Sequence, residues 1–304
     1  MKITISLLLG ALLFTACDLI KYHPYEMDED SPRGLTTQNI SLIEPRCAGH
    51  DTLRFIFMTD TQRQYDHTRD AVDQICRMPD IDFVLHGGDL TDFGLADEFK
   101  WMTEELCRLN APWVTVIGNH DFLGVGEHNY MRIYGDYNWS FNAGHTHIVG
   151  LNTNSREQEY SIAVPDFNFL QADINSVDSL NHLCPDSITR TIVLMHSHPG
   201  DEQFNSNVVL PFGYFLRRYP GLSVDGPRIS PEELLNWPIT ETDRQAIAGS
   251  YRQGFALTGH THHHDLRRLL DDDLLFYECP DIKKREVYLF TLYPDCYTYE
   301  PISF

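Results

Sequence analysis

Short apolar runs alternate with amphipathic stretches along the chain from residue 53 onward. Within 95–109 (LADEFKWMTEELCRL), apolar residues recur every three or four positions, which is the period of a helix that packs one face on a sheet. The pattern predicts strands at 53–59, 81–86 and 112–117, and helices near 67–77 and 95–109. Repeated strand–helix–strand units favour parallel strands joined by right-handed crossovers.

The pattern changes after residue 137. The stretch 138–153 (NWSFNAGHTHIVGLNT) has aromatic and β-branched residues on both sides of a turn, which predicts an antiparallel pair. A helix is expected at 165–177, and the later strand candidates are 189–196, 255–258, 273–278, 286–293 and 296–302.

The chain of 304 residues is long enough to bury one large core. We expect a single domain at 51–304, of class α/β. The segment 199–253 is rich in Pro, Gly and aromatic residues and is predicted to be a cap-like insertion.

The first seventeen residues have the layout of an export signal. Lys2 is followed by an apolar stretch and then by Thr15, Ala16 and Cys17, a pattern similar to the lipobox of bacterial lipoproteins. We expect a signal peptide at 1–16, a lipidated Cys17 that anchors the protein to the membrane, and a polar tether over 17–50. The protein would then be exported and anchored to the cell envelope. An ordinary signal peptide with an incidental Cys is the alternative.

Charge and cysteine content narrow the classes of partner. With 44 acidic and 23 basic residues, the net charge of −21 repels phosphate backbones, so nucleic acid is not expected as a partner. A small anionic substrate would need a local positive centre, which a bound metal can supply. An exported protein can form disulfides, but Cys76 and Cys107 lie on the helical patterns and are equally consistent with buried thiols.

Potential metal ligands follow each of five predicted strands. The strand ends carry Asp60 and Gln62, GGDLTD with Asp89, GNHD with Asn119, His120 and Asp121, MHSH with His196, and GHTH with His260 and His262. Ligands collect at the carboxyl ends of strands in α/β sheets. Carboxylate, amide and imidazole together suit Mn, Fe, Zn or Ni.

The chemistry of such a cluster is that of two-metal hydrolysis. A carboxylate such as Asp89 can bridge two ions, and a water held between them would lose a proton near neutral pH and attack a phosphoryl group in line. His120 is then expected to be the proton donor or to stabilise the transition state, with Asp121 orienting it.

The order of these motifs resembles the five signatures of the calcineurin-like metallophosphoesterases. Along the chain they are D-x-Q, GGDLTD, GNHD, the strand-end His and GHTH. The resemblance implies a four-layered αββα sandwich of two mixed β-sheets. It also implies two divalent metal ions, one held by Asp60, Asp89 and His262, the other by Asp89, Asn119, His196 and His260. The implied substrate is a small phosphomonoester or phosphodiester.

Gln62 departs from the family pattern, in which a His ligates the first metal. A neutral amide oxygen there predicts a site with altered affinity or metal preference. It also leaves open a second hypothesis, a surface lipoprotein that binds metal or another ligand without catalysis. Asp92 is interpreted as a helix cap, and His198 is expected to face substrate or solvent.

Overall fold

The computed structural model describes residues 23–24, 26–27, 29–159, 162–222, 254–268 and 274–304. The expected signal peptide, Cys17 and residues 223–253 of the insertion lie outside these ranges. In the described part of the chain, none of the helices is both long enough and apolar enough to cross a membrane.

In the described residues, eleven strands form two mixed sheets. The first sheet has the order β11-β10-β1-β2-β3 and the second β4-β5-β6-β7-β9-β8. The strands of the first sheet are β1 (Leu53–Met58), β2 (Phe83–His86), β3 (Trp113–Thr115), β10 (Glu286–Leu292) and β11 (Tyr297–Ser303). Those of the second sheet are β4 (Trp139–Ala143), β5 (Thr146–Leu151), β6 (Arg190–Met195), β7 (Phe255–Thr258), β8 (Asp265–Arg268) and β9 (Leu275–Glu278).

Each sheet combines parallel and antiparallel pairs. Strands β1, β2 and β3 run parallel, as do β5, β6, β7 and β9. The predicted antiparallel pair at 138–153 is the β4–β5 hairpin, in which Phe141 faces Ile148. The parallel strands of each sheet therefore deliver their carboxyl ends to one end of the sandwich.

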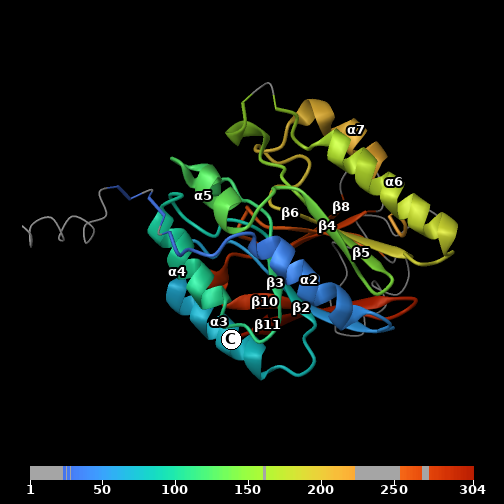
Figure 1. The fold of residues 1–304 in the computed structure, drawn as a ribbon, viewed down its shortest axis with the longest axis horizontal. Helices are drawn as coiled ribbons and strands as arrows, with labels where there is room; N and C mark the ends of the chain where they lie inside the picture. Colours follow the sequence, from blue (N-terminus) through green and yellow to red (C-terminus); the bar gives the residue numbers. More distant parts are fainter. Residues whose placement is uncertain (1–22, 25, 28, 160–161, 223–253, 269–273) are drawn as a thin grey trace, which may run out of the picture.

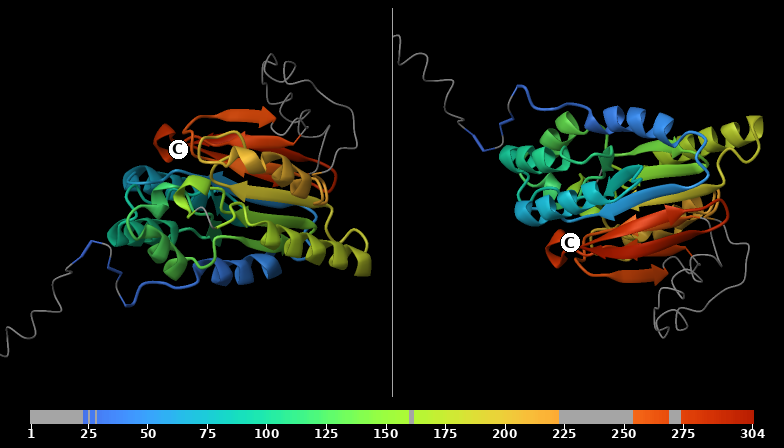
Figure 2. Two further views of the ribbon diagram at one scale, coloured as in Figure 1. Left: turned by 90° about the horizontal axis from the view of Figure 1, so that it is seen from above. Right: turned by 90° about the horizontal axis from the view of Figure 1, so that it is seen from below.

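Helices cover the two outer faces of the sandwich (Figures 1 and 2). These helices are α3 (Tyr65–Arg77), α4 (Ala96–Leu106) and α5 (Gly126–Ile133) on the first sheet, and α6 (Phe167–Leu183) and α7 (Val209–Leu216) on the second. Alternate residues of β1 show the layering, because Ile56 packs with α3 and α4 whereas Phe55 and Phe57 face the other sheet. The predicted αββα sandwich is confirmed.

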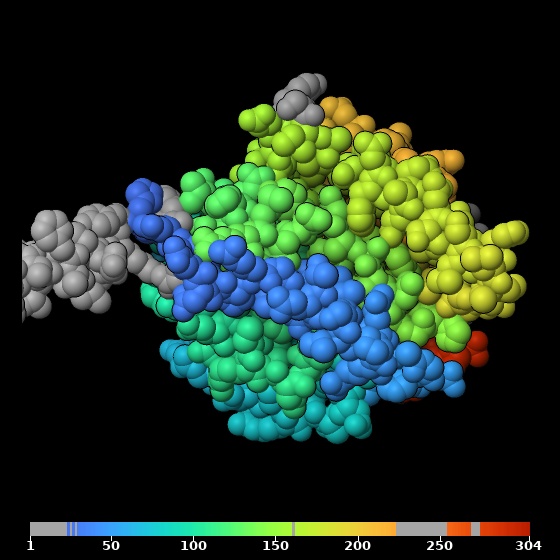
Figure 3. All heavy atoms as spheres, viewed as in Figure 1, coloured from blue at the N-terminus to red at the C-terminus, as the bar shows by residue number. Residues whose placement is uncertain are grey.

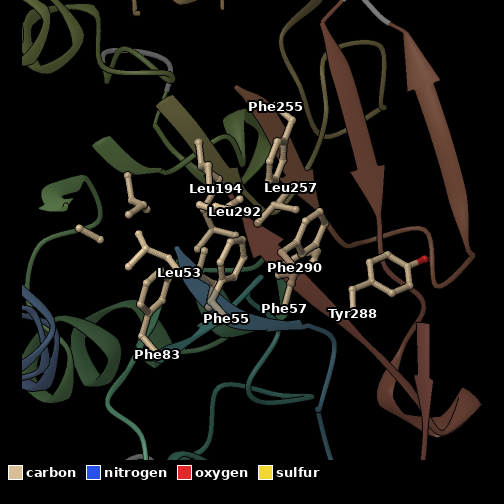
Figure 4. Packing of buried hydrophobic residues seen from close by; sticks show 14 of the residues in the cluster. Leu53, Phe55, Phe57, Phe83, Leu194, Phe255, Leu257, Tyr288, Phe290 and Leu292 are labelled. Atoms are coloured by element: carbon tan, nitrogen blue, oxygen red, sulfur yellow. The ribbon is translucent and has the colours of Figure 1, made fainter. Parts of the chain in front are cut away.

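Aromatic residues fill the space between the sheets (Figure 4). Phe55 stacks between Phe83 and Phe290, with ring centroids 5.1 Å from each, and Phe290 stacks on Phe255 of the other sheet at 4.9 Å. Each of these rings is fully buried. Burial of a large apolar side chain contributes roughly 1.5–3 kcal/mol, so this layer holds the two sheets, and hence their strand ends, in fixed relation.

A helix lies within the segment expected to be a tether. Helix α2 (Leu35–Cys47) packs against the edge strands β3 and β4, with Ile43 and Cys47 fully buried, and Figure 3 shows it on the surface of the molecule. It covers the edge where the two sheets meet. The pattern did not reveal it because few of its residues are apolar and Pro45 lies inside it. The ordered domain therefore begins before residue 51.

The described cysteines Cys47, Cys76, Cys107, Cys184, Cys279 and Cys296 are free thiols. Cys47 and Cys279 are buried, whereas Cys76 is partly buried and Cys107 is exposed. The buried thiols are therefore not the two that the helical patterns indicated.

Candidate metal centre

Side chains from both sheets meet at the carboxyl ends of the parallel strands. The structure brings together all the predicted metal ligands, which are Asp60 and Gln62 after β1, Asp89 after β2, Asn119 after β3, His196 after β6, and His260 and His262 after β7. These residues divide into two groups that share Asp89.

The second group is a tight cluster of four donor atoms. Asn119 Oδ1 lies 3.0 Å from His196 Nε2 and 2.9 Å from His260 Nδ1, and these two nitrogens are 3.3 Å apart. Asp89 Oδ1 is 3.4 Å from His196 Nε2. Ligands about 2.0–2.2 Å from one ion stand about 3.0–3.5 Å from each other, so this cluster fits a single metal ion.

Hydrogen bonds from the outer ring nitrogens of His196 and His260 show why this cluster suits a cation. His196 Nδ1 donates to the carbonyl oxygen of Gly87 at 2.8 Å, and His260 Nε2 lies 3.2 Å from Asp201 Oδ1. In a neutral imidazole with its proton on that outer nitrogen, the inner nitrogen presents a lone pair. Lone pairs from two imidazoles, an amide oxygen and a carboxylate then face one another, an arrangement that a cation stabilises.

The first group is more open. One ligand atom from each of Asp60, Asp89 and His262 lies within 4.8 Å of the others, and His262 Nε2 is 3.2 Å from Asp60 Oδ1. The side chain of His262 is 37 % exposed, whereas both carboxylates are buried. Gln62 lies beside this group, with its Nε2 donating to Asp89 Oδ2 at 3.4 Å. Rotation of that amide by half a turn would present its oxygen instead.

The buried carboxylates of Asp60 and Asp89 favour positive charge at the candidate metal centre. Burial by itself lowers the pKa of His196, but the carboxylates of Asp89 and Asp60 raise it well above its usual value. Burial raises the pKa of Asp89, but the charges of His196 and His120 outweigh that effect and lower it. The field of the two buried carboxylates therefore stabilises a cation, whether a proton or a metal ion.

Five of the site residues have a left-handed backbone. Their positive φ angles are 51° for Asp60, 40° for Gln62, 54° for Asp89, 73° for His260 and 61° for His262. This conformation costs roughly 1–2 kcal/mol for a residue with a side chain. The loops hold it because the surrounding hydrogen bonds fix them, such as Asp60 N to Gly88 O at 3.1 Å and Gln62 N to Asp89 O at 2.9 Å.

Two glycines give the carboxylates their space. A Cβ atom on Gly118 would meet the carboxylate of Asp89, and one on Gly259 would meet that of Asp60. Backbone can approach both acidic groups only because these positions lack side chains.

His120 lies beside the first and second groups on the 3₁₀ helix His120–Phe122, and its backbone N–H donates to Asp89 Oδ1 at 2.9 Å. Its Nδ1 is 2.8 Å from the carbonyl oxygen of Asp92 and 3.6 Å from the Asp92 carboxylate. Burial lowers the pKa of His120, but Asp89 and Asp92 raise it above its usual value.

The structure corrects the expected role of Asp121. Its carboxylate accepts hydrogen bonds from the backbone N–H groups of Leu90, Thr91 and Gly118, at 2.9–3.2 Å, and from the Thr91 hydroxyl. Asp121 therefore ties the GGDLTD loop to the GNHD loop. The residue that orients His120 is Asp92.

The helix-cap role given to Asp92 is wrong as well. Glu98 takes that role for α4, because its carboxylate accepts from the N–H groups of Phe93 and Leu95. Asp92 instead contacts His120 and forms a 2.7 Å ion pair with Arg63. Asp92 lies three positions after Asp89 in GGDLTD, and this closeness to a candidate ligand was the sequence signal that Asp92 belongs to the site.

Two further histidines near the site, His86 and His198, are buried. His86 is fully buried and hydrogen-bonds Thr61 and the N–H of Gly88, and burial lowers its pKa to about 3. His198 was expected to face substrate or solvent, and its burial excludes solvent. It is buried against the carbonyl of Pro199 and 3.3 Å from an Arg267 nitrogen.

Carboxylates and imidazoles gathered at the strand ends of an αββα sandwich form a candidate metal site. The sequence profile of the calcineurin-like phosphoesterases matches residues 53–264, more than half of the chain. The chain belongs to this family, whose members are metal-dependent phosphoesterases.

Individual relatives are distant. A probable cyclic nucleotide phosphodiesterase of Xenorhabdus bovienii is 20 % identical over 153 residues, which cover 47 % of this chain and 56 % of the relative. A probable glycerophosphodiester phosphodiesterase of Arcobacter nitrofigilis is 29 % identical over 91 residues, or 27 % of this chain and 32 % of the relative. The chain thus spans about half and one third of the lengths of these two proteins.

Among solved structures, GAP50, the anchor in the inner membrane complex of Plasmodium, superposes with a TM-score of 0.51 and 12 % identity, covering 84 % of this chain and 85 % of that one. At that identity the likeness concerns the fold.

Proposed function

We propose that the protein hydrolyses a small phosphate ester with the help of two divalent metal ions. The observation that carries this proposal is the meeting of seven potential ligands in two groups that share Asp89, with His120 beside them. Bound divalent ions would supply positive charge to the phosphoryl oxygens and lower the pKa of the water that attacks phosphorus.

His120 acts on the leaving oxygen in this proposal. Its Nδ1–H donates to the Asp92 carbonyl, which leaves Nε2 available for the transferred proton. When the bond between phosphorus and the ester oxygen breaks, the protonated ring gives that proton to the departing alkoxide. Asp92 holds the ring, and Asp121 holds the loop that carries it.

A diester or monoester of small size is the proposed substrate. The names of the two curated relatives favour a diester, although their matches are partial. The net charge of −21 disfavours a nucleic acid, since the surface would repel its backbone.

The test uses metal-free protein reloaded with Mn, Fe, Zn or Ni in turn, assayed against monoesters, diesters and pyrophosphates. We expect hydrolysis that depends on the added metal, and two ions per chain by elemental analysis. Loaded protein that hydrolyses no member of this panel would overturn the enzymatic proposal and favour a metal-binding protein without catalysis.

We also propose export and lipid anchoring at Cys17, on the pattern of residues 1–17. Mass spectrometry of the protein from membranes is expected to show a new N-terminus at a lipidated Cys17. A Cys17→Ser variant that still fractionates with membranes would contradict the anchor.

A further inference from the structure

The segment that follows β6 returns to the metal centre at one point. Asp201 Oδ1 lies 3.2 Å from His260 Nε2, on the side of the ring away from Asn119 and His196. We propose that Asp201 is a positioning residue that fixes the tautomer and orientation of His260, and so sets the affinity of the second group for its metal ion. This inference rests on the metal-binding part of the proposed function.

The turn that carries Asp201 is fixed independently of His260. The Asp201 carboxylate accepts from the N–H of Gln203 at 2.8 Å, and the Asp201 N–H donates to the His198 carbonyl at 3.1 Å. Phe204 N–H donates to the Asp201 carbonyl, and the Phe204 side chain is buried among the residues under α6 and α7. A carboxylate held in this way is in place before the imidazole meets a metal.

The direction of the imidazole follows from this contact. His260 Nε2–H donates to Asp201, so Nδ1 carries the lone pair, and Nδ1 is the atom that faces Asn119 Oδ1. Without the carboxylate, the ring is free to hold its proton on Nδ1 and to rotate away. Removal of such an outer partner typically lowers metal affinity about 10- to 100-fold.

The other ring of the group has a different outer partner. His196 donates to a backbone carbonyl, that of Gly87, which no substitution of a side chain removes directly. Asp201 is therefore the outer contact of the second group that can be changed by mutation while all four metal-facing residues are kept.

The experiment compares wild type, Asp201→Ala, Asp201→Asn and Glu202→Ala as metal-free proteins. Glu202 is the matched control, because it is the next residue, lies in the same turn and is exposed in a 3.4 Å pair with Arg156. Titration with Mn²⁺ by calorimetry gives the stoichiometry and both affinities. NMR of ¹⁵N-labelled histidines gives the tautomer of His260.

We expect Asp201→Ala to weaken one of the two Mn²⁺ sites by about 10- to 100-fold and to leave the other unchanged, with loss of the Nε2–H tautomer. Asp201→Asn keeps an acceptor oxygen and should lose less, and Glu202→Ala should match wild type. Unfolding temperatures check that each variant is folded, and Asp201→Asn serves as the test if Asp201→Ala does not fold.

Wild-type Mn²⁺ affinities and tautomer in Asp201→Ala would overturn the inference, as would an equal loss in Glu202→Ala. If wild type binds two ions and Asp201→Ala weakens one site, but neither protein hydrolyses an ester, the proposed enzymatic function fails while the role of Asp201 stands. If the enzyme is active and Asp201→Ala binds both ions normally, only the role of Asp201 fails.

Discussion

The two halves of the candidate metal centre share Asp89 but differ in construction. In the second group, donor atoms of Asn119, His196 and His260 already lie 2.9–3.3 Å apart. In the first group, His262 is 37 % exposed and its other ring nitrogen is 4.0 Å from the nearest Asp281 oxygen. The second group is thus preorganised by the fold, whereas the first depends more on the ion to hold it together.

The difference arises from what surrounds each imidazole. His196 and His260 each have an outer acceptor within 3.2 Å, the Gly87 carbonyl and the Asp201 carboxylate. An imidazole that such a partner already orients does not have to be reoriented when the metal ion binds. We therefore expect a chelator to remove the ion of the first group before that of the second.

Asp89→Asn should have the largest effect, because both groups lose the same carboxylate. We expect the binding of both ions to weaken and hydrolysis to fall by at least about 100-fold, which elemental analysis and steady-state kinetics would measure. Asp70→Asn, an exposed carboxylate paired with Arg285, is the control. Loss of only one ion in Asp89→Asn would show that the two groups do not share this residue.

His120→Gln separates chemistry from metal binding. His120→Gln keeps the backbone N–H that donates to Asp89 and removes no candidate ligand, so both metal affinities should change far less than hydrolysis. Hydrolysis should fall by about 10²- to 10⁴-fold, the usual contribution of a general acid. Esters with leaving groups of low pKa need less protonation and should be affected least. An equal loss for all leaving groups would exclude proton donation as the role of His120.

Sequence alone located the candidate ligands, because each one directly follows an apolar run. Asp60, Asp89 and His260 are found by reading where those runs end. The four layers were expected only from the family resemblance, and the structure shows them along β1, where Ile56 packs with the helices and Phe55 faces the other sheet.

The partners behind the ligands were not predictable in this way. Asp201 and His260 are 59 positions apart and belong to no shared motif, so only the packing of the turn after β6 brings them together. Asp92 was misassigned because an aspartate just before a helix has the pattern of a cap, and the competing Glu98 lies inside the helix. Helix α2 was not predicted, because its burial depends on the edge strands β3 and β4 that it covers and not on a regular apolar pattern of its own.

A pair of substitutions tests the comparison directly. His196→Ala removes a fully buried ligand whose ring is already oriented, and we expect its ion to bind more than about 100-fold more weakly, since even an outer partner is worth 10- to 100-fold. His262→Ala removes the exposed ligand of the looser group, so its loss should be smaller. Calorimetry with Mn²⁺ on both variants measures the two losses. A greater loss in His262→Ala would reverse the assignment of the preorganised half.

Gln62→His should change metal affinity least among these variants, and it should raise the affinity of the first group. An imidazole is a stronger ligand for transition metals than a neutral amide, and His accepts the left-handed backbone that Gln62 adopts at a φ of 40°. We expect the ion of the first group to bind about tenfold more tightly while that of the second group is unaffected. Metal titration of wild type and variant checks this. Unchanged affinity and metal preference would mean that Gln62 is not a ligand and that another donor, such as Asp281 beside His262, completes the first group.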